Sequence, residues 1–376
     1  MMAFDGRAVA RLALAHLVND VNQSAVLGAL PVLVAQRGLS YVAASGLAIA
    51  LTASSAIVQP VLGHVADRRP SPVLVPALLV IGAGGVALVG ALGGRVALAL
   101  AVIAVGVATA AFHPEALRLV QLAGGPRRTT ALAVFSVGGN LGTASGPLVA
   151  AGLVGWLGLP GLAGIIVPSL VVAAALRPTV ARRRAPRSTG ATGPPQRRRF
   201  ARLVGVLIVR SALSGYLTTF VPLVLVQAGR TPTYAGAIVT LVLLAGVIAA
   251  PVAGRLADRF GARAVLLGAL LPLGPLLAVF AWSGGALRVA AVVLVGAGAM
   301  ATYSVAVDAA QRCLPGRDGL AGGIAMGLGS LGAVVLLGFG ALADRAGLSA
   351  TLPVAVALPV VAVLLVAPRG PRPVPR

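Results

Sequence analysis

The chain has 376 residues, of which 58% are hydrophobic and only 10% are charged. A soluble globular protein carries about 25% charged residues, so this composition excludes a water-soluble chain, which would have too few charged groups to cover its surface. The formal net charge of +22 comes from 30 Arg and no Lys; these are scattered in short clusters rather than gathered on one basic face, which excludes a nucleic-acid-binding domain.

Continuous apolar runs of about 20 residues, the length a helix needs to cross a bilayer, predict twelve transmembrane helices. A β-barrel is excluded, because its strands would show alternating apolar and polar residues over segments of about ten residues. In chain order the helices are expected over residues 9–33, 42–64, 72–92, 96–118, 130–153, 157–176, 203–227, 233–256, 263–283, 287–309, 319–341 and 349–367. The first run is too long for a signal peptide and contains polar residues, so we expect no cleavable leader.

The distribution of Arg predicts the orientation in the membrane. With both termini in the cytoplasm, 24 Arg fall on the cytoplasmic side, five on the opposite side, and Arg210 lies within the membrane. This asymmetry follows the positive-inside rule and requires an even number of spans. Nine of the 24 lie in the segment 177–202, which is too basic to span and is expected to lie along the anionic inner leaflet.

The two halves of the chain repeat each other. The stretch from Gly63 to Arg68 recurs from Gly254 to Arg259, an offset of 191 residues (254 minus 63), and Pro31 recurs at the same offset as Pro222. A constant offset across separate helices indicates duplicated six-helix units, as in secondary transporters. We therefore predict three parts, an N-terminal six-helix bundle, a cytoplasmic basic linker and a C-terminal six-helix bundle, over residues 1–176, 177–202 and 203–376.

The first predicted helix carries His16, Asn19, Asp20 and Gln23 at spacings of three and four residues, which places them on one face. An ionisable group in a membrane helix costs about 2.5–3.5 kcal/mol, so this face cannot point at lipid. Asp20 lies about 13.5 Å along the helix from Arg11, near the middle of the bilayer. We expect this set to bind substrate or protons. For His16, a proton shuttle and a hydrogen-bond donor that orients the Asp20 carboxylate both remain open.

Arg210 in the seventh predicted helix corresponds to Asn19 at the offset of 191 residues. Our hypothesis is that Asp20 and Arg210 face each other across a central cavity. Arg stays charged throughout, whereas protonation of Asp20 would free Arg210 for an anionic substrate. The alternative is a static ion pair that only fixes the packing of the two halves.

The fourth predicted helix ends with His113, Pro114 and Glu115, followed by Arg118. Proline permits a kink in a membrane helix, and Glu115 can pair with Arg118 three residues later. One interpretation makes His113 and Glu115 proton- or substrate-binding groups at the cytoplasmic mouth of the cavity. The other is an interfacial ion pair that closes the end of the helix.

The repeated stretch carries a family resemblance. Residues 254–263 fit closely, with Ala262 between Gly261 and Arg263, the pattern G-x-x-x-D-R-x-G-R that follows the second helix in the major facilitator superfamily, and the chain resembles this superfamily along essentially its whole length. The first copy has Pro70 where Gly is usual. The resemblance implies an all-α membrane protein of twelve helices in two pseudo-symmetric bundles, around a central cavity lined mainly by helices 1, 4, 7 and 10.

Three stretches, residues 16–24, 112–116 and 137–142, resemble more narrowly the fosmidomycin-resistance group of drug exporters. One departure from the related drug–proton antiporters is Val102, four residues before Gly106, where many of them carry an Arg. Whichever group handles protons in this chain, it is not that Arg.

The resemblance also implies roles outside the cavity. It assigns gating of the cytoplasmic side to a set of charged residues, with the two Asp bonding across the seam between the bundles. The gating residues are Asp67, Arg68, Arg118, Asp258 and Arg259. A charge cluster that only fixes topology is the alternative.

The fifth predicted helix contains Gly142, Gly146 and Pro147, similar to an antiporter motif, although Ala150 and Ala151 replace its usual Gly pair. Small residues allow close backbone approach, either for rocking of the bundles or for generic packing.

Together these observations predict a secondary active transporter of the inner (cytoplasmic) membrane that exports a small drug-like or anionic metabolite by proton-coupled antiport and alternating access, and so confers drug or antibiotic resistance. An uptake carrier for a metabolite or sugar on the same fold, and a non-transporting receptor, are the alternatives. The expected partners are the substrate, protons and membrane lipid, with no nucleic acid, and the expected state is a monomer. We expect no enzymatic activity, no cofactor and no metal.

Overall fold

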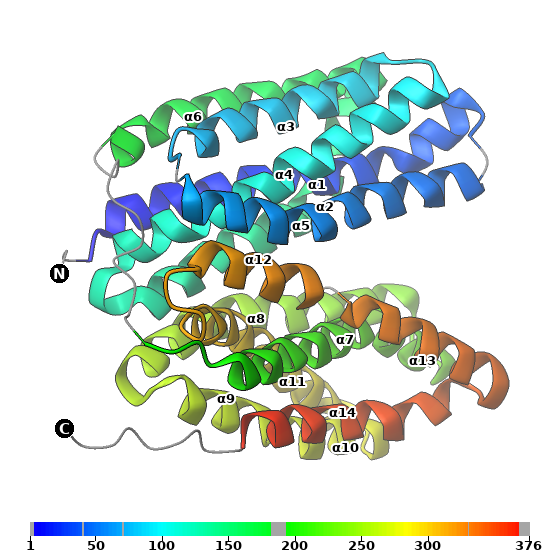
Figure 1. Cartoon of the computed structure of the whole chain (residues 1–376). Helices are drawn as coiled ribbons and strands as arrows, with labels where there is room; N and C mark the ends of the chain where they lie inside the picture. Colours follow the sequence, from blue (N-terminus) through cyan, green and yellow to red (C-terminus); the bar gives the residue numbers. More distant parts are fainter. Residues whose placement is uncertain (1–3, 40, 70, 182–192, 330, 368–376) are drawn as a thin grey trace. The chain divides into compact units, whose positions relative to one another are not determined.

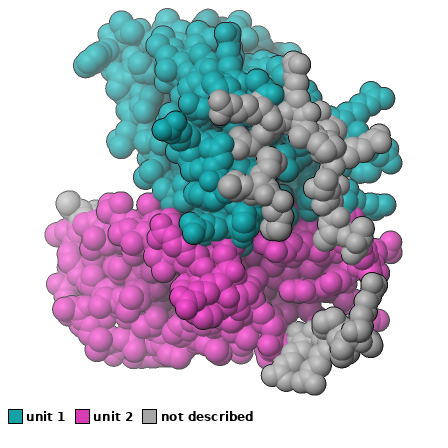
Figure 2. Space-filling view, turned by 90° about the vertical axis from the view of Figure 1, so that its left-hand side faces the viewer, with its two compact units in different colours: residues 1–192, 316–327 teal, residues 193–315, 328–376 magenta. Residues whose placement is uncertain are grey.

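The computed structural model describes residues 4–39, 41–69, 71–181, 193–329 and 331–367 (Figure 1). These residues form helices joined by short turns and contain no strand, which confirms the predicted all-α class. The chain divides into two compact units, coloured separately in Figure 2. Unit 1 comprises residues 1–192 and 316–327, and unit 2 comprises residues 193–315 and 328–376.

Unit 1 contains the helices of the first half of the chain. They are α1 (Gly6–Arg37), α2 (Tyr41–Arg68), α3 (Leu74–Ala91), α4 (Arg95–Gly124), α5 (Arg128–Leu157) and α6 (Ile166–Ala181), with short 3-10 segments at Gly125–Arg127 and Leu159–Ile165. A piece from the second half joins them, because helix α12 (Asp318–Gly329) is counted with unit 1 up to Gly327.

Unit 2 contains the remaining helices. They are α7 (Arg197–Gln227), α8 (Pro232–Phe260), α9 (Ala262–Leu270), α10 (Leu273–Trp282), α11 (Gly285–Gln311), α13 (Gly332–Ala346) and α14 (Thr351–Val366), with a 3-10 turn at Leu348–Ala350.

Ten stretches of the described residues are long and apolar enough to cross a membrane. One of them, Arg95–Leu157, has 63 residues and holds both α4 and α5. Helix α2, 28 residues long, is a further helix of spanning length. The described helices therefore account for the twelve predicted spans, the ninth of which is made of α9 and α10 and the eleventh of α12 and α13.

The helices extend beyond the apolar runs that predicted them. Helix α4 continues to Gly124 rather than ending at residue 118, α6 continues to Ala181, and α7 begins at Arg197 rather than at residue 203. Polar and basic residues continue a helix outside the hydrocarbon, where water satisfies their side chains, so hydropathy underestimates helix length. The part of the basic linker over residues 182–192, with Arg182–Arg184 and Arg187, lies outside the described residues.

The internal duplication is visible in the helices. Pro31 inside α1 and Pro222 inside α7 occupy equivalent places, as do Pro60 inside α2 and Pro251 inside α8. The packing partners correspond as well, because α2 packs extensively on α4 and α8 packs extensively on α11. Each unit thus repeats the same pair of contacts in its own set of helices.

The core of unit 1 has two apolar clusters separated along the helices. One cluster takes residues 8–18 of α1 with Phe112 and Phe135, and the other takes residues 25–33 of α1 with Val102 and Val154. Between them, α1, α4 and α5 turn polar and small residues inward. This polar layer consists of His16, Asn19, Asp20, Asn22 and Ser24 from α1, Thr109 and His113 from α4, and Gly138, Gly139, Gly142 and Gly146 from α5.

Candidate functional site

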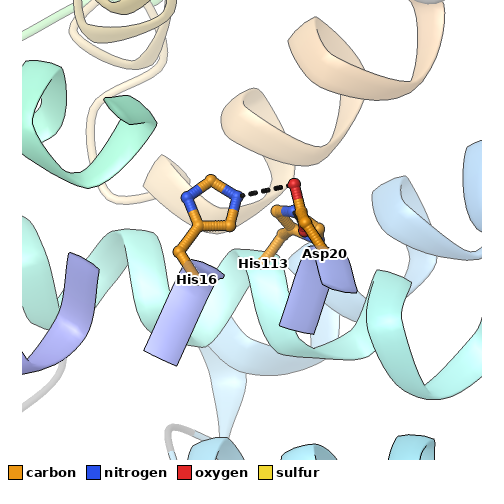
Figure 3. A group of neighbouring side chains, drawn as sticks. All are labelled: His16, Asp20 and His113. Atoms are coloured by element: carbon orange, nitrogen blue, oxygen red, sulfur yellow. Dashed lines mark ion pairs between the residues drawn. The ribbon is translucent and has the colours of Figure 1, made fainter. Parts of the chain in front are cut away.

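The polar layer of unit 1 holds a cluster of three ionisable side chains, His16 and Asp20 from α1 and His113 from α4 (Figure 3). His16 Nε2 lies 3.4 Å from Asp20 Oδ2, and His113 Nε2 lies 3.7 Å from Asp20 Oδ1. Both imidazoles are buried, and Asp20 retains a little exposure. The sequence placed His16 and Asp20 on one helical face; the structure adds His113 from a different helix.

The two imidazoles are held in one orientation by backbone carbonyls. His16 Nδ1 lies 2.8 Å from the carbonyl oxygen of Phe135, and His113 Nδ1 lies 2.7 Å from that of Thr109. A carbonyl oxygen only accepts hydrogen bonds, so in both rings Nδ1 carries the proton and donates it. In a neutral ring the Nε2 lone pair then points at the Asp20 carboxylate. Each lone pair and the carboxylate repel each other, so this arrangement favours a proton or another cation between them.

Two further side chains hold the Asp20 carboxylate. Asn19 Nδ2 donates to Asp20 Oδ1 at 3.0 Å, and the Thr143 hydroxyl of α5 donates to Asp20 Oδ2 at 3.4 Å. Asn19 is fully buried, and its side-chain oxygen has no hydrogen-bond partner among the described residues. Gln23 lies half-buried on the same side of α1. Thr143 was not predicted, because nothing in a single sequence pairs a Thr of the fifth helix with an Asp of the first.

Glycines of α5 bring α1 close enough to build this cluster. The His16 ring stacks on Phe135 with ring centroids 4.0 Å apart, and a Cβ at Gly139 would overlap the His16 ring. A Cβ at Gly142 would overlap the Leu17 carbonyl oxygen, and one at Gly146 would overlap the Ser24 hydroxyl. Of the predicted packing residues, Gly142 and Gly146 thus lie directly against α1, and the backbone of Pro147 lies against Gly28 of α1.

Glu115 and Arg118 form an ion pair within α4. Arg118 Nε lies 3.1 and 3.2 Å from the two Glu115 carboxylate oxygens, and Glu115 is only 2% exposed. Unit 2 has an equivalent pair near the end of α11, where Arg312 Nη2 lies 2.8 Å from Asp308 Oδ2. This pair was not predicted from the sequence. Its signal was an acidic residue four positions before an Arg at the end of the tenth span.

Asp67 binds the first turn of α12 within unit 1. Its two carboxylate oxygens accept the backbone N–H groups of Gly319 at 2.7 Å and Leu320 at 2.9 Å. Burial raises the pKa of the Asp67 carboxyl above its ordinary value, and the two N–H donors oppose that shift. Nearby, Arg128 Nη2 lies 3.8 Å from Asp318 Oδ1. Asp67 is therefore an N-terminal cap for a helix 252 residues later in the chain.

The other predicted gating residues lie at the ends of helices. Arg68 is exposed at the end of α2. Asp258 is half-buried near the end of α8, and the Arg259 guanidinium lies 5.1 Å from the centre of the Phe260 ring.

Arg210 lies in the interior of α7 and is held by two neutral groups of α11. Its Nε donates to the Ala299 carbonyl oxygen at 3.2 Å, and its guanidinium lies 4.8 Å from the centre of the Tyr303 ring. The acidic residue of α11, Asp308, lies nine residues beyond Ala299 and pairs with Arg312. Asp20 belongs to unit 1 and Arg210 to unit 2, so their facing each other stays a prediction.

The cluster of unit 1 also has the donor set of a metal site. One ring nitrogen from each His and one carboxylate oxygen of Asp20 all lie within 4.8 Å of one another. No metal was predicted from the sequence. His16 and Asp20 lie on one helix, but the third donor, His113, is about a hundred residues away in the chain, so no short ligand motif connects the three.

Comparison with known proteins assigns the family. The sequence profile of the Major Facilitator Superfamily matches residues 12–228 and 203–376. The chain belongs to this superfamily. Members related to it in sequence include an uncharacterized MFS-type transporter YfnC of Bacillus subtilis (strain 168), 30% identical, with 94% of this chain and 90% of the relative covered. The fosmidomycin resistance protein of Escherichia coli (strain K12) is 27% identical, with 94% and 91% covered.

Solved major facilitator structures share the fold. The human organic anion transporter MFSD10 matches with a TM-score of 0.73 at 17% identity, covering 97% of this chain and all of that one. A bacterial homologue of the iron transporter ferroportin matches with a TM-score of 0.73 at 18% identity, covering 96% and 98%. This major facilitator chain is therefore a multi-pass membrane transporter and not an enzyme.

Proposed function

We propose that the chain exports a small drug-like or anionic molecule across the inner membrane by alternating access, in exchange for protons, with both termini in the cytoplasm. The observation that carries this proposal is the cluster of His16, Asp20 and His113 buried in the polar layer of unit 1. Groups of this kind are costly inside a membrane and mark ion or substrate pathways. The relative named for fosmidomycin resistance supports export of a drug-like molecule.

The two units supply opposite charges for this exchange. In unit 1 the Asp20 carboxylate and the two Nε2 atoms attract a cation, and in the proposed cycle that cation is a proton. In unit 2 Arg210 is held by neutral groups and attracts an anion. In the proposed cycle a proton in the cluster neutralises Asp20, and Arg210 is then available to the anionic substrate. Asn19, Gln23 and Glu115 complete the proposed set of substrate- and proton-binding groups.

Asp67 supplies the proposed gate on the cytoplasmic side, together with Arg68, Arg118, Asp258 and Arg259. Its bonds to the first turn of α12 stabilise that helix end, because they satisfy two backbone donors that would otherwise be unpaired. Release of this cap during the cycle would let α12 move away from α2.

Transport direction is tested with cells that express the chain and with everted membrane vesicles. Cells that express the chain are tested against a panel of small anionic and amphipathic antibiotics that includes fosmidomycin. They should tolerate at least one compound better than control cells, and a protonophore should abolish this tolerance. That compound should also accumulate in energised everted vesicles. Raised sensitivity with uptake into whole cells would identify an uptake carrier instead. Absence of flux and of substrate-dependent proton movement for the whole panel would favour a receptor.

Replacing Arg210 with Gln is expected to lower transport of an anionic substrate at least about tenfold, a loss of about 1.4 kcal/mol of interaction. Arg210→Lys should recover only part of the rate, because an ammonium group lacks the planar fork of donors. The matched control is Arg288→Gln, since Arg288 also donates to a carbonyl oxygen, that of Phe280 at 2.8 Å, and lies over an aromatic ring. Equal rates in both Gln variants would contradict the role of Arg210.

Replacing Asp67 with Ala is expected to loosen the first turn of α12, since loss of a helix cap costs about 0.5–2 kcal/mol. Hydrogen exchange measured by mass spectrometry should become faster in peptides that cover residues 316–327. Asp344→Ala serves as the control, because Asp344 stands in a similar local sequence but is exposed on α13. Unchanged exchange in the Asp67 variant would show that the cap does not hold this helix end.

A further inference from the structure

The cluster of His16, Asp20 and His113 has the geometry of a site for a larger cation than a proton. In zinc sites the metal lies about 2.0–2.1 Å from imidazole nitrogen and about 2.0–2.2 Å from carboxylate oxygen. Two such ligands at a tetrahedral angle are about 3.4 Å apart. The observed separations between Nε2 and carboxylate oxygen are 3.4 Å to Oδ2 and 3.7 Å to Oδ1. One donor atom from each side chain lies within 4.8 Å of the others, so the two imidazoles would have to move closer together to hold a common ion.

The surroundings of the three donors match those of metal-binding residues. A metal-ligating His donates its other ring N–H to a carbonyl or carboxylate, which fixes the ring and leaves the second nitrogen free. Both imidazoles follow this rule, with Nδ1 bonded to the carbonyl oxygens of Phe135 and Thr109. The carboxylate is oriented by donors from Asn19 and Thr143. The supporting contacts come from three helices, α1, α4 and α5, so the donors are held by the packed core.

The number of protein donors would leave one coordination position for a further ligand. Three protein donors fill three positions of a tetrahedral ion and leave the fourth for water or an anion. The buried side-chain oxygen of Asn19, which has no hydrogen-bond partner among the described residues, lies on the residue next to Asp20. A water molecule bound to the ion could donate a hydrogen bond to this oxygen. The carboxylate also offsets part of the charge of a divalent ion in this apolar setting.

We propose that His16, Asp20 and His113 form a binding site for a divalent transition-metal ion of the Zn²⁺ class. Two imidazoles and one carboxylate suit Zn²⁺, Co²⁺ or Ni²⁺, whereas Mg²⁺ and Ca²⁺ prefer all-oxygen sites. This inference stands on the donor geometry alone and does not depend on the transport direction. A bound ion occupies the place between Asp20 and the two imidazoles, so we expect Zn²⁺ to block transport.

The sequence makes this proposal simple to test. The chain has three His and one Cys; the third His, His64, lies on α2 and is not among the grouped donors, and Cys313 is buried in unit 2. The purified full chain in detergent should retain one Zn²⁺ in equilibrium dialysis against a Mg²⁺ buffer. His113→Gln and Asp20→Asn should each weaken retention at least about tenfold, the scale of losses at metal sites. The matched control His64→Gln should bind as the wild type does.

Two readouts keep the test decisive where a variant folds poorly. X-ray absorption of the wild-type protein loaded with Zn²⁺ should show a shell of nitrogen and oxygen near 2.0–2.1 Å with imidazole scattering, and Co²⁺ loading should give the absorption of a four-coordinate ion. Two results would overturn the proposal. One is a wild-type chain that retains no Zn²⁺; the other is loss of Zn²⁺ retention in the His64 variant together with normal retention in the His113 variant. Transport measured without added metal remains a separate result, so failure of the metal site and failure of export can be distinguished.

Discussion

Asp20→Asn is expected to lower proton-driven transport at least about tenfold, equivalent to about 1.4 kcal/mol, while leaving the folded protein intact. The amide keeps the size of the carboxyl group but removes the negative charge that both imidazoles face at 3.4 and 3.7 Å. Without that charge the cluster no longer attracts a cation, and the exchange between cation and substrate loses its coupling. The measurement is substrate-dependent proton movement in proteoliposomes.

The control for this variant is Asp344→Asn, which removes one of the eight acidic residues of the chain at an exposed position. It should transport at the wild-type rate. Thermal melting and size-exclusion profiles of both variants should match the wild type, because the amide at position 20 keeps the shape of the carboxyl group and one of its two acceptor oxygens. A folded Asp20 variant with full proton coupling would show that the cluster is a packing feature of α1 and α4.

Gly142→Leu is expected to prevent normal folding of unit 1. A Cβ at this position would overlap the Leu17 carbonyl oxygen and lie 3.0 Å from the Asp20 Cβ. Because the first obstacle is backbone, α1 and α5 would have to separate, and α1 packs more extensively on α5 than on any other described helix. Overpacking of a well-packed core costs about 1–3 kcal/mol, and a backbone obstacle places this variant at the upper end.

The same helix provides the comparison. Gly155 of α5 has no atom within 4 Å of where a Cβ would lie, so Gly155→Leu adds the same side chain at an open position. The yield of monodisperse protein after solubilisation and its melting temperature should both fall strongly for the Gly142 variant and stay unchanged for the Gly155 variant. Similar yields for both variants would mean that the contact between α1 and α5 tolerates separation.

The fold was largely predictable because lipid imposes simple requirements. Each span must be a helix of apolar residues, and hydropathy locates such helices without any knowledge of packing. Helix ends were less predictable, since α4 and α7 continue through polar residues such as Gln121 and Arg198 that no apolar run includes. The break at Leu271–Pro272 interrupts a predicted span inside apolar sequence, where hydropathy carries no signal.

The site was predictable only where its residues share a helix. The spacing of His16 and Asp20 placed them together, whereas the contact of Asp20 with His113 and Thr143 depends on how α1, α4 and α5 pack. The pair of Asp308 and Arg312 was missed for a different reason. At the offset of 191 residues Glu115 corresponds to Ala306, so a shift of two positions hides the equivalence.

The place of residues 316–327 bears on how the protein is made. They are counted with unit 1, and their first turn is held by Asp67, yet the ribosome reaches them only after most of unit 2 has been synthesised. During most of translation, the N-terminal bundle is therefore in the bilayer without its contacts to residues 316–327. A gene divided at the basic linker would give two polypeptides, the first of which lacks a piece that only the second can supply.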